Sequence, residues 1–449
     1  MASLPVLTIL EANQVSPPPA TVVNKSLPLT FYDILFLDLP AVNNLYFYTL
    51  PLTKTHFIHT IVPTLKHSIS ITLQHFFPFA GNLFIFPSST KKLPEIRYID
   101  GDFVKFTIAE CNLDFDHLTG NHPRNCDEFN LLIPQLEETT YKTSDYIKLA
   151  TFSLQVTVFP SNGFSIGMAR HHSLGDANTL FYFLKAWTSI ARCGTNDAFL
   201  ANGTLPMYDR LVNYPELDKS FLKYANIEAF FSQEYKPSNL SATDKVRATF
   251  VLTRTVIYRL KNRVLSQIPT TSSHISSFIV VCAYIWCCVA KTRNDEKQMF
   301  YIPIECRKRL DPPIPASYFG NCIRLCISIA KTSLITGNQG IINAAKILGD
   351  NLHKELAEKD QLVNDYSTFN FDEMPRSMIS ISGTSKFVFY DMDFGWGKPK
   401  KLELVSDGYG LNVSIYASKE CNQDLEIGIS LTVAEMQLFV HVFNEGLEL

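Results

Sequence analysis

Two periods of apolar residues run through the first half of the chain and predict a mixture of helices and strands. Apolar residues recur every four positions from Phe57 to Leu73, which predicts a helix that ends before Pro78. Residues 29–39 and 44–50 are instead rich in aromatic and branched side chains, as strands are. The first half is therefore expected to combine both kinds of element.

A hairpin followed by a helix is predicted further along this half. Residues 154–159 and 164–168 alternate between apolar and small or polar residues on either side of a Ser-Asn-Gly turn at 161–163. After Asp176 the apolar period becomes helical. The residues on the apolar face are Leu180, Phe183, Leu184, Trp187 and Ile190. We expect this helix to pack against a sheet.

The pattern becomes irregular in the middle of the chain. Residues 193–241 are rich in polar and turn residues, and we interpret them as a linker between a first domain, 1–192, and a second domain, 242–449. A chain of 449 residues is long enough for two domains of about 200 residues each.

The second half again mixes helices and strands. The predicted elements are a strand over 247–260, a helix capped near Ser276, a Pro-rich turn at 311–315, a helix over 340–357 and strands from 386 onward.

Composition narrows the range of partners. Hydrophobic residues make up 46% of the chain and charged residues 18%, which favours a compact globular protein. The net charge of −3 provides no field that would attract nucleic acid or an anionic membrane. We therefore expect small-molecule partners. We also expect the protein to be a monomer.

The N-terminal sequence, the apolar runs and the cysteines indicate where the protein resides and whether it binds a metal. The start of the sequence lacks the pattern of a secretory signal, and the longest apolar run, residues 278–290, is shorter than the roughly 20 residues that span a bilayer. The ten cysteines form no CxxC pair, which favours free thiols over disulfides or a zinc site. We expect a cytosolic protein without a metal.

The hairpin delivers two histidines, His171 and His172, to a turn at the end of its second strand, just before Asp176. A histidine at the end of a strand is well placed to face a cleft, and a neutral imidazole can take a proton from a hydroxyl as that oxygen attacks a carbonyl. The pattern alone also fits two loop histidines and a helix cap at Asp176. Both interpretations stay open at this point.

A second motif lies within the same strand. Residues 163–167 match the GxSxG nucleophile elbow of hydrolases, in which the serine occupies a sharp turn between a strand and a helix. Ser165 is instead predicted to lie inside a strand, on a face shared with Gly167 and Ala169. We therefore interpret this match as accidental.

Late in the chain two glycines flank a tryptophan, in the order Asp393, Phe394, Gly395, Trp396 and Gly397. Three lysines, at 398, 400 and 401, follow. The glycines suggest a loop that closely approaches another group, and the lysines could contact phosphate. A structural turn with a solvated basic end is the alternative. The sequence contains no P-loop and no dinucleotide-binding motif.

The combination of His172-x-x-x-Asp176 with Asp393-Phe-Gly-Trp-Gly397 resembles the plant BAHD acyltransferases, in which these two signatures occur in this order. Segments PLTFYD, HFFPFAGNL from His75 and LKAW resemble that family too, so the resemblance covers the whole chain. The segment YFGNC, residues 318–322, resembles the subgroup that acylates anthocyanin and flavonoid glycosides, many of whose members are malonyltransferases.

The resemblance implies an α/β fold like that of chloramphenicol acetyltransferase, with two similar-sized domains, each a mixed sheet with flanking helices, and an active-site channel between them. His172 would be the general base, and no bound cofactor or metal is implied. Asp176 would be structural and pair with Arg307 or Arg309, of which we prefer Arg307. Asp393 would hold its loop together with Gly395, Trp396 and Gly397, or have a second catalytic role.

The resemblance also implies the substrates. We expect transfer of malonyl from malonyl-CoA to a sugar hydroxyl, at the 6'' position, of an anthocyanin or flavonoid glucoside. A malonyl carboxylate favours a fixed cation, and Arg170 is the nearest candidate. For acyl-CoA binding we add Ser276, Ser277, Lys398 and Lys400. The alternatives are a hydroxycinnamoyl-CoA-dependent enzyme that acts on a phenolic glycoside, alcohol or amine, and an inactive ligand-binding paralogue.

Overall fold

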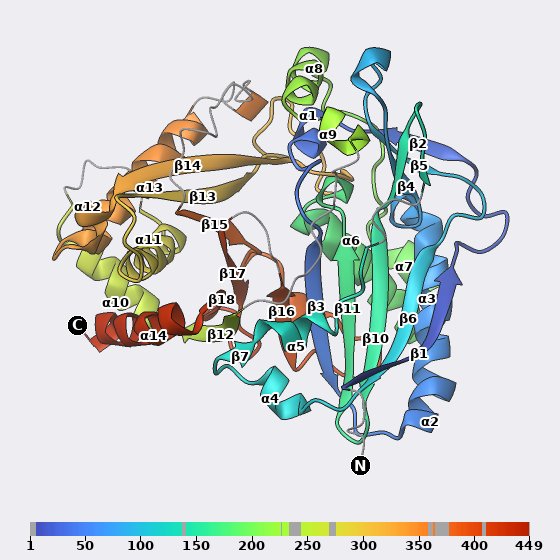
Figure 1. Cartoon of the computed structure of the whole chain (residues 1–449), viewed down its shortest axis with the longest axis horizontal. Helices are drawn as coiled ribbons and strands as arrows, with labels where there is room; N and C mark the ends of the chain where they lie inside the picture. The colour runs from blue at the N-terminus through green and yellow to red at the C-terminus, as the bar shows by residue number, and fades with distance from the viewer. Residues whose placement is uncertain are drawn as a thin grey trace.

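Two large mixed sheets and one smaller antiparallel sheet organise the molecule (Figure 1). The computed structural model describes residues 6–136, 141–225, 227–232, 244–268, 275–357, 362–363, 377–405 and 410–448. Figure 1 places the first large sheet with α3, α6 and α7 on one side and the second with α10 to α14 on the other. We propose that these two groups are the two domains.

The first large sheet contains the hairpin that carries the histidines. Its strand order is β1 (Leu7–Val15), β6 (Val104–Cys111), β10 (Phe152–Phe159), β11 (Gly163–Arg170), β3 (Val42–Thr49) and β16 (Lys401–Val405). β10 and β11 pair antiparallel from Phe159 opposite Gly163 to Phe152 opposite Arg170. The predicted hairpin and the strand over 44–50 are confirmed.

Helices α3 (Val62–His75) and α6 (Ala177–Cys193) pack beside this sheet. α3 continues a short helix α2 (Lys54–His56) and a π-helical turn η1 (Phe57–Ile61), so the predicted helix is confirmed. Trp187 of α6 is fully buried, and its indole N–H donates to Ser68 Oγ at 3.0 Å. Both predicted helices therefore join one core.

The strand predicted over residues 29–39 is wrong. Residues Phe31–Ile34 form a short helix, α1. Asp33 accepts hydrogen bonds from the backbone N–H and the hydroxyl of Thr30, which makes a reciprocal cap at the start of the helix. Local capping therefore outweighs the strand preference of the aromatic side chains.

The second large sheet has the strand order β14 (Ile323–Lys331), β13 (Lys297–Glu305), β15 (Met378–Ser382), β17 (Leu411–Ala417), β18 (Leu425–Thr432), β12 (Lys245–Leu252) and β7 (Arg124–Asn125). Its helices are α10 (Arg254–Leu265), α11 (Ser277–Ala290), α12 (Thr332–Thr336), α13 (Gly340–Ala357) and α14 (Val433–Glu448). The cap at Ser276 and the helix over 340–357 are confirmed.

Two predictions for this half need correction. The strand expected to run to residue 260 ends at Leu252, because the hydroxyl of Thr253 caps α10. The strands expected from residue 386 onward are present as β16, β17 and β18, but the last part of the chain forms helix α14 instead of a strand. There Glu435 accepts hydrogen bonds from the N–H and hydroxyl of Thr432, a cap at the helix start.

The smaller sheet and the short elements complete the described residues. The sheet order is β2 (Lys25–Pro28), β5 (Glu95–Tyr98), β4 (Asn82–Ile85), β9 (Ile147–Ala150) and β8 (Tyr141–Lys142). The short helices are η2 (Phe77–Phe79), η3 (Ser88–Thr90), α4 (Phe115–Thr119), α5 (Cys126–Asn130), η4 (His172–Leu174) and η7 (Phe389–Asp391).

The predicted linker is more regular than its sequence suggests. Helices α7 (Asp197–Asn202), α8 (Pro215–Tyr224) and α9 (Ile227–Phe231) occupy much of residues 193–241. Residues 226 and 233–241 of the predicted linker lie outside the described residues.

The two halves of the chain also exchange strands. β16 comes from the second half and pairs with β3 in the first sheet, whereas β7 comes from the first half and pairs with β12 in the second sheet. Glu403 of β16 meets Arg124 of β7 at 2.9 Å and Arg247 of β12 at 2.5 Å. Burial would raise the pKa of Glu403, but Arg247 and Arg124 lower it to about 2. This buried charge cluster joins the two sheets.

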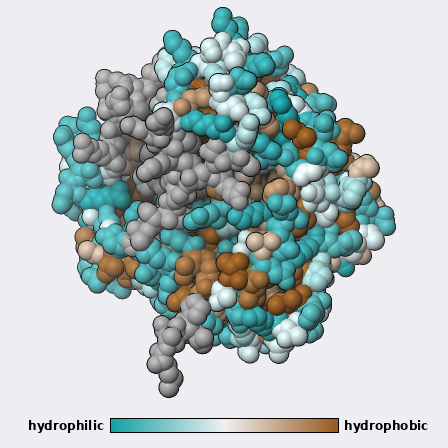
Figure 2. Space-filling view, turned by 45° about the vertical axis from the view of Figure 1, so that its right-hand side comes forward, coloured by the Kyte–Doolittle hydropathy of each residue, from teal (hydrophilic) through white to brown (hydrophobic). Residues whose placement is uncertain are grey.

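The surface mixes polar and apolar residues. Figure 2 shows teal and brown residues interspersed over one face, with brown residues gathered near its lower part. Within the residues that the structure describes, every helix is too short or too polar to cross a bilayer.

Candidate active site

The candidate site begins where β11 ends. His172 opens the 3₁₀ turn η4, and Asp176 caps helix α6 four residues later. The His172 ring stacks on Phe36, with ring centroids 4.0 Å apart and planes 11° from parallel. His171 is buried, and its Nδ1 accepts a hydrogen bond from the Ser173 N–H. His172 is the more exposed of the two rings.

The His172 imidazole is neutral near pH 7. Burial lowers its pKa to about 3 because a charged ring loses hydration, and the nearby Arg170 cation lowers it further. Its Nδ1 has no partner in another residue. Because Nδ1 is buried, the neutral ring would take a proton through its other nitrogen, Nε2, as a general base does.

Asp176 is engaged differently. One carboxylate oxygen accepts the N–H groups of Asn178 and Thr179 at 3.1 Å each, as an N-cap does. Arg307 donates to both oxygens, at 2.7 and 3.1 Å, and the Cys322 N–H adds a bond at 3.1 Å. Burial raises the pKa of Asp176, but Arg307 and these donors lower it more. The ion pair that the resemblance implies is therefore present and buried.

Arg307 connects this carboxylate to the YFGNC segment. Its guanidinium also donates to the carbonyls of Tyr318 and Gly320. Gly320 has a φ of +118°, a backbone conformation that glycine adopts without strain, and its N–H and carbonyl both contact the Thr179 hydroxyl. The segment after β13 is thus fastened to the start of α6.

Two buried residues hold the backbone of the histidine turn, and sequence reasoning did not single them out. Asn321 Nδ2 donates to the His172 carbonyl and to Asp33 Oδ1, at 3.0 Å each. The Ser173 hydroxyl donates to the Asp33 carbonyl at 3.0 Å. Asp33 and Asn321 do lie in the PLTFYD and YFGNC segments, which was the available signal.

The loop that contains Trp396 lies away from the His172 turn. Asp393 Oδ1 accepts the N–H groups of Gly395 and Gly397 at 2.7 and 3.0 Å, and both glycines have φ above +100°. The Trp396 ring meets Phe164, with centroids 6.0 Å apart. Phe164 is six residues before Arg170 on β11, which corresponds to about 20 Å along the strand. The structure therefore does not bring Asp393 together with His172.

The remaining predicted residues do not converge on one point either. Lys398 pairs with Asp391 at 2.6 Å in an exposed position, and Lys400 pairs with Asp116 at 2.5 Å. Ser276 caps α11 through the Ile279 N–H, and Ser277 is exposed as the first residue of that helix.

Ser165 does not form a nucleophile elbow. It lies in the middle of β11, opposite Thr157 of β10 and Phe47 of β3, and it is fully buried. The prediction that it lies inside a strand is confirmed. Among the described residues, no group of three or more His, Cys, Asp or Glu side chains could hold a metal ion.

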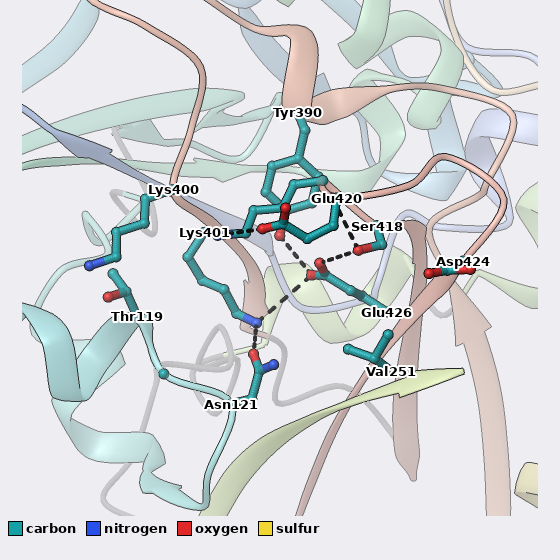
Figure 3. A pocket seen from close by; sticks show the side chains of 12 residues that line it. Thr119, Asn121, Val251, Tyr390, Lys400, Lys401, Ser418, Glu420, Asp424 and Glu426 are labelled. Atoms are coloured by element: carbon teal, nitrogen blue, oxygen red, sulfur yellow. Dashed lines mark hydrogen bonds and ion pairs between the residues drawn. The ribbon is translucent and has the colours of Figure 1, made fainter. Parts of the chain in front are cut away.

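A cavity of about 440 Å³ opens beside the strand exchange (Figure 3). Lys401 on its wall donates to Asn121 at 2.7 Å, and Glu426 accepts from Tyr390 and Ser418 at 2.7 and 3.1 Å. Lys401 pairs with Phe47 on β3, five residues from the Val42 that faces Arg170, or about 17 Å away. This cavity is separate from the His172 turn.

Comparisons with known proteins agree with this fold. A family model described as "Transferase family" matches residues 6–445. The chain is 46% identical to a malonyl-coenzyme A:anthocyanin 3-O-glucoside-6''-O-malonyltransferase of Dahlia pinnata, over 100% of this chain and 99% of that protein. It is 38% identical to a malonyl-coenzyme:anthocyanin 5-O-glucoside-6'''-O-malonyltransferase of Salvia splendens, over 98% and 95%. The crystal structure of vinorine synthase superimposes with a TM-score of 0.70 at 19% identity, over 96% of each chain.

Proposed function

The chain belongs to the Transferase family of BAHD acyltransferases, and we propose that it transfers malonyl from malonyl-CoA to the 6'' sugar hydroxyl of an anthocyanin or flavonoid glucoside. One observation carries the chemistry. His172 is neutral and lies in a turn whose backbone is fixed by hydrogen bonds from the buried residues Asn321 and Ser173. The choice of substrates rests on the relatives, which carry those substrates in their names.

The proposed reaction needs one base. His172 removes the proton of the sugar hydroxyl while the oxygen attacks the thioester carbonyl, and the carbonyl π electrons move onto oxygen. The tetrahedral oxyanion then collapses, the bond to sulfur breaks, and the CoA thiolate takes the proton from His172. The products are the malonate ester and free CoA. No redox change occurs, and malonyl-CoA is a co-substrate rather than a bound cofactor.

We propose structural roles for the other motif residues. Asp176 and Arg307 fix the turn, because both side chains are buried and bonded to each other and to backbone. Asp393, Gly395, Trp396 and Gly397 shape a loop at the far end of β11, so we assign Asp393 no second catalytic role. Binding of CoA by Ser276, Ser277, Lys398 and Lys400 stays a prediction, testable by the KM for malonyl-CoA in single alanine variants.

The alternatives differ in donor or in turnover. A hydroxycinnamoyl-CoA-dependent enzyme would form coumaroyl esters or amides, and an inactive paralogue would release no thiol. Purified protein incubated with malonyl-CoA and coumaroyl-CoA against a pool of flavonoid glycosides distinguishes these cases by product mass. The proposal predicts malonyl esters. Coumaroyl products alone, or an absence of thiol release with both donors, would refute it.

A further inference from the structure

A cluster of buried polar groups lies beside His172 and is not used by the mechanism above. Arg170 ends β11, Asn44 and Tyr46 lie on the neighbouring strand β3, and Tyr416 lies on β17 of the second sheet. Arg170, Asn44 and Tyr46 are 6%, 4% and 2% exposed. The alternation of β11 and β3 puts these three side chains on the same face of the first sheet.

Three atoms of this cluster have no hydrogen-bond partner. They are the Nε of Arg170, the hydroxyl of Tyr46 and the Oδ1 of Asn44. Buried polar atoms in folded proteins are nearly always paired, because an unpaired one has lost its hydration without replacement. The charge of Arg170 acts on Tyr46, and two unpaired donors that interact in this way indicate a site that a ligand completes.

The charge of Arg170 points to the kind of ligand. Its Nη1 donates a hydrogen bond to the Gly175 carbonyl at 2.5 Å, and a carbonyl carries no full charge. Asp176 is the nearest acid, but it already accepts two bonds from Arg307 and three from backbone N–H groups. Burial accordingly lowers the pKa of Arg170 to about 10. The cation lacks an anion of its own.

We propose that Arg170 and Tyr46 bind the free carboxylate of the malonyl group and so select malonyl-CoA over donors without that carboxylate. The inference rests on the function proposed above and names the residues that recognise the acyl donor, malonyl-CoA. A guanidinium donates through Nε and Nη to a carboxylate, and the Tyr46 hydroxyl supplies a further donor. The carboxylate would provide the anion that Arg170 lacks.

The position relative to the base fits a malonyl group. Arg170 precedes His172 by two residues, and its charge acts on the His172 ring. In malonyl-CoA only one methylene separates the carboxylate from the reacting carbonyl, so a carboxylate held by Arg170 keeps the thioester within reach of His172. A carboxylate bound there also offsets the positive charge that disfavours protonation of His172.

The test compares malonyl-CoA with acetyl-CoA, which lacks only the carboxylate. We expect Arg170→Met to lower the ratio of kcat/KM for malonyl-CoA over acetyl-CoA roughly 100-fold, Arg170→Lys to restore part of it, and Tyr46→Phe to lower it roughly tenfold. Arg254→Met and Tyr258→Phe, both on exposed positions of α10, are the matched controls and should keep the wild-type ratio.

The outcomes separate the two proposals. If wild-type protein makes no malonyl ester, the proposed function fails and the inference fails with it. If wild-type protein makes malonyl esters but Arg170→Met and Tyr46→Phe reduce both donors equally, the function stands and the carboxylate site is refuted. Should Arg170→Met fail to fold, Tyr46→Phe decides alone, because it removes a single oxygen that has no partner.

Discussion

Asp176 and Arg307 form a buried, two-pronged ion pair that joins the turn after β11 to the segment after β13, across 131 residues of sequence. The pair fixes three backbone segments at once, since Asp176 caps α6 and accepts the Cys322 N–H while Arg307 donates to two carbonyls. His172, the proposed general base, therefore lies on a turn that is held from outside its own strand.

Breaking this pair should destabilise the protein. Arg307→Met leaves the Asp176 carboxylate buried without its cation, and we expect a loss of about 3–5 kcal/mol in the free energy of unfolding. Urea unfolding of the variant and of the exposed control Arg254→Met gives the comparison. An Arg307→Met variant as stable as the control would contradict a structural role.

The pH profile should reflect the lowered pKa of His172. The ring must be neutral to act as a base, and its pKa of about 3 keeps it neutral well below the ordinary 6.5. We expect kcat/KM to show no loss centred near pH 6.5. Arg170→Met removes a cause of the lowering, so any acid-side loss should move to higher pH. A wild-type profile that falls with an apparent pKa near 6.5 would contradict this.

The free energy of unfolding should also depend on pH, below the ordinary histidine pKa of 6.5. The folded-state pKa values of His171 and His172, about 4 and 3, lie below the unfolded value of 6.5. Between these values the unfolded chain binds more protons, so stability falls as pH drops below about 6.5. Thermal unfolding at pH 7.5 and 5 should show a smaller drop in Tm for a His171→Phe variant than for wild type.

Asn321 should position the base rather than touch substrate. Its amide joins the His172 carbonyl to Asp33, so Asn321→Ala frees the turn. We expect kcat to fall about 10- to 100-fold with little change in KM, because a small displacement of the base slows proton transfer. A structural role alone would lower the active fraction and leave kcat per folded molecule unchanged. Active-site titration separates the two.

The Trp396 loop should contribute stability only. Asp393→Ala removes two hydrogen bonds to backbone N–H groups, which we expect to cost about 1–3 kcal/mol. The kcat of the folded variant should stay within about threefold of wild type. A loss of kcat as large as that of His172→Ala would instead give Asp393 the catalytic role that its position argues against.

Sequence patterns predicted the elements whose signals are local. The four-residue spacing before Pro78, the hairpin turn at 161–163 and the amphipathic stretch over 340–357 each contain their own evidence. The strand prediction for residues 29–39 was wrong because one reciprocal cap between Thr30 and Asp33 outweighs many strand-favouring side chains. The period of a sequence does not record such a cap.

The strand exchange and much of the site could not be predicted, because both depend on distant pairing. Lys401 lies beside Phe47 only in the folded sheet, and Tyr416 reaches the Arg170 cluster from the other sheet. Arg307 was inferred as the partner of Asp176 by resemblance, whereas Asn321 emerges from its contacts and Tyr46 from its buried, unpaired hydroxyl.

The central claim is that this chain is a malonyltransferase whose base is His172. Its most direct test is single-turnover formation of the malonyl ester from malonyl-CoA and an anthocyanin 3-O-glucoside by wild-type protein and by His172→Ala, with equal folding verified by Tm. The account predicts ester formation by wild type and a rate lower by at least about 100-fold in the variant. Near-normal turnover by His172→Ala would contradict it.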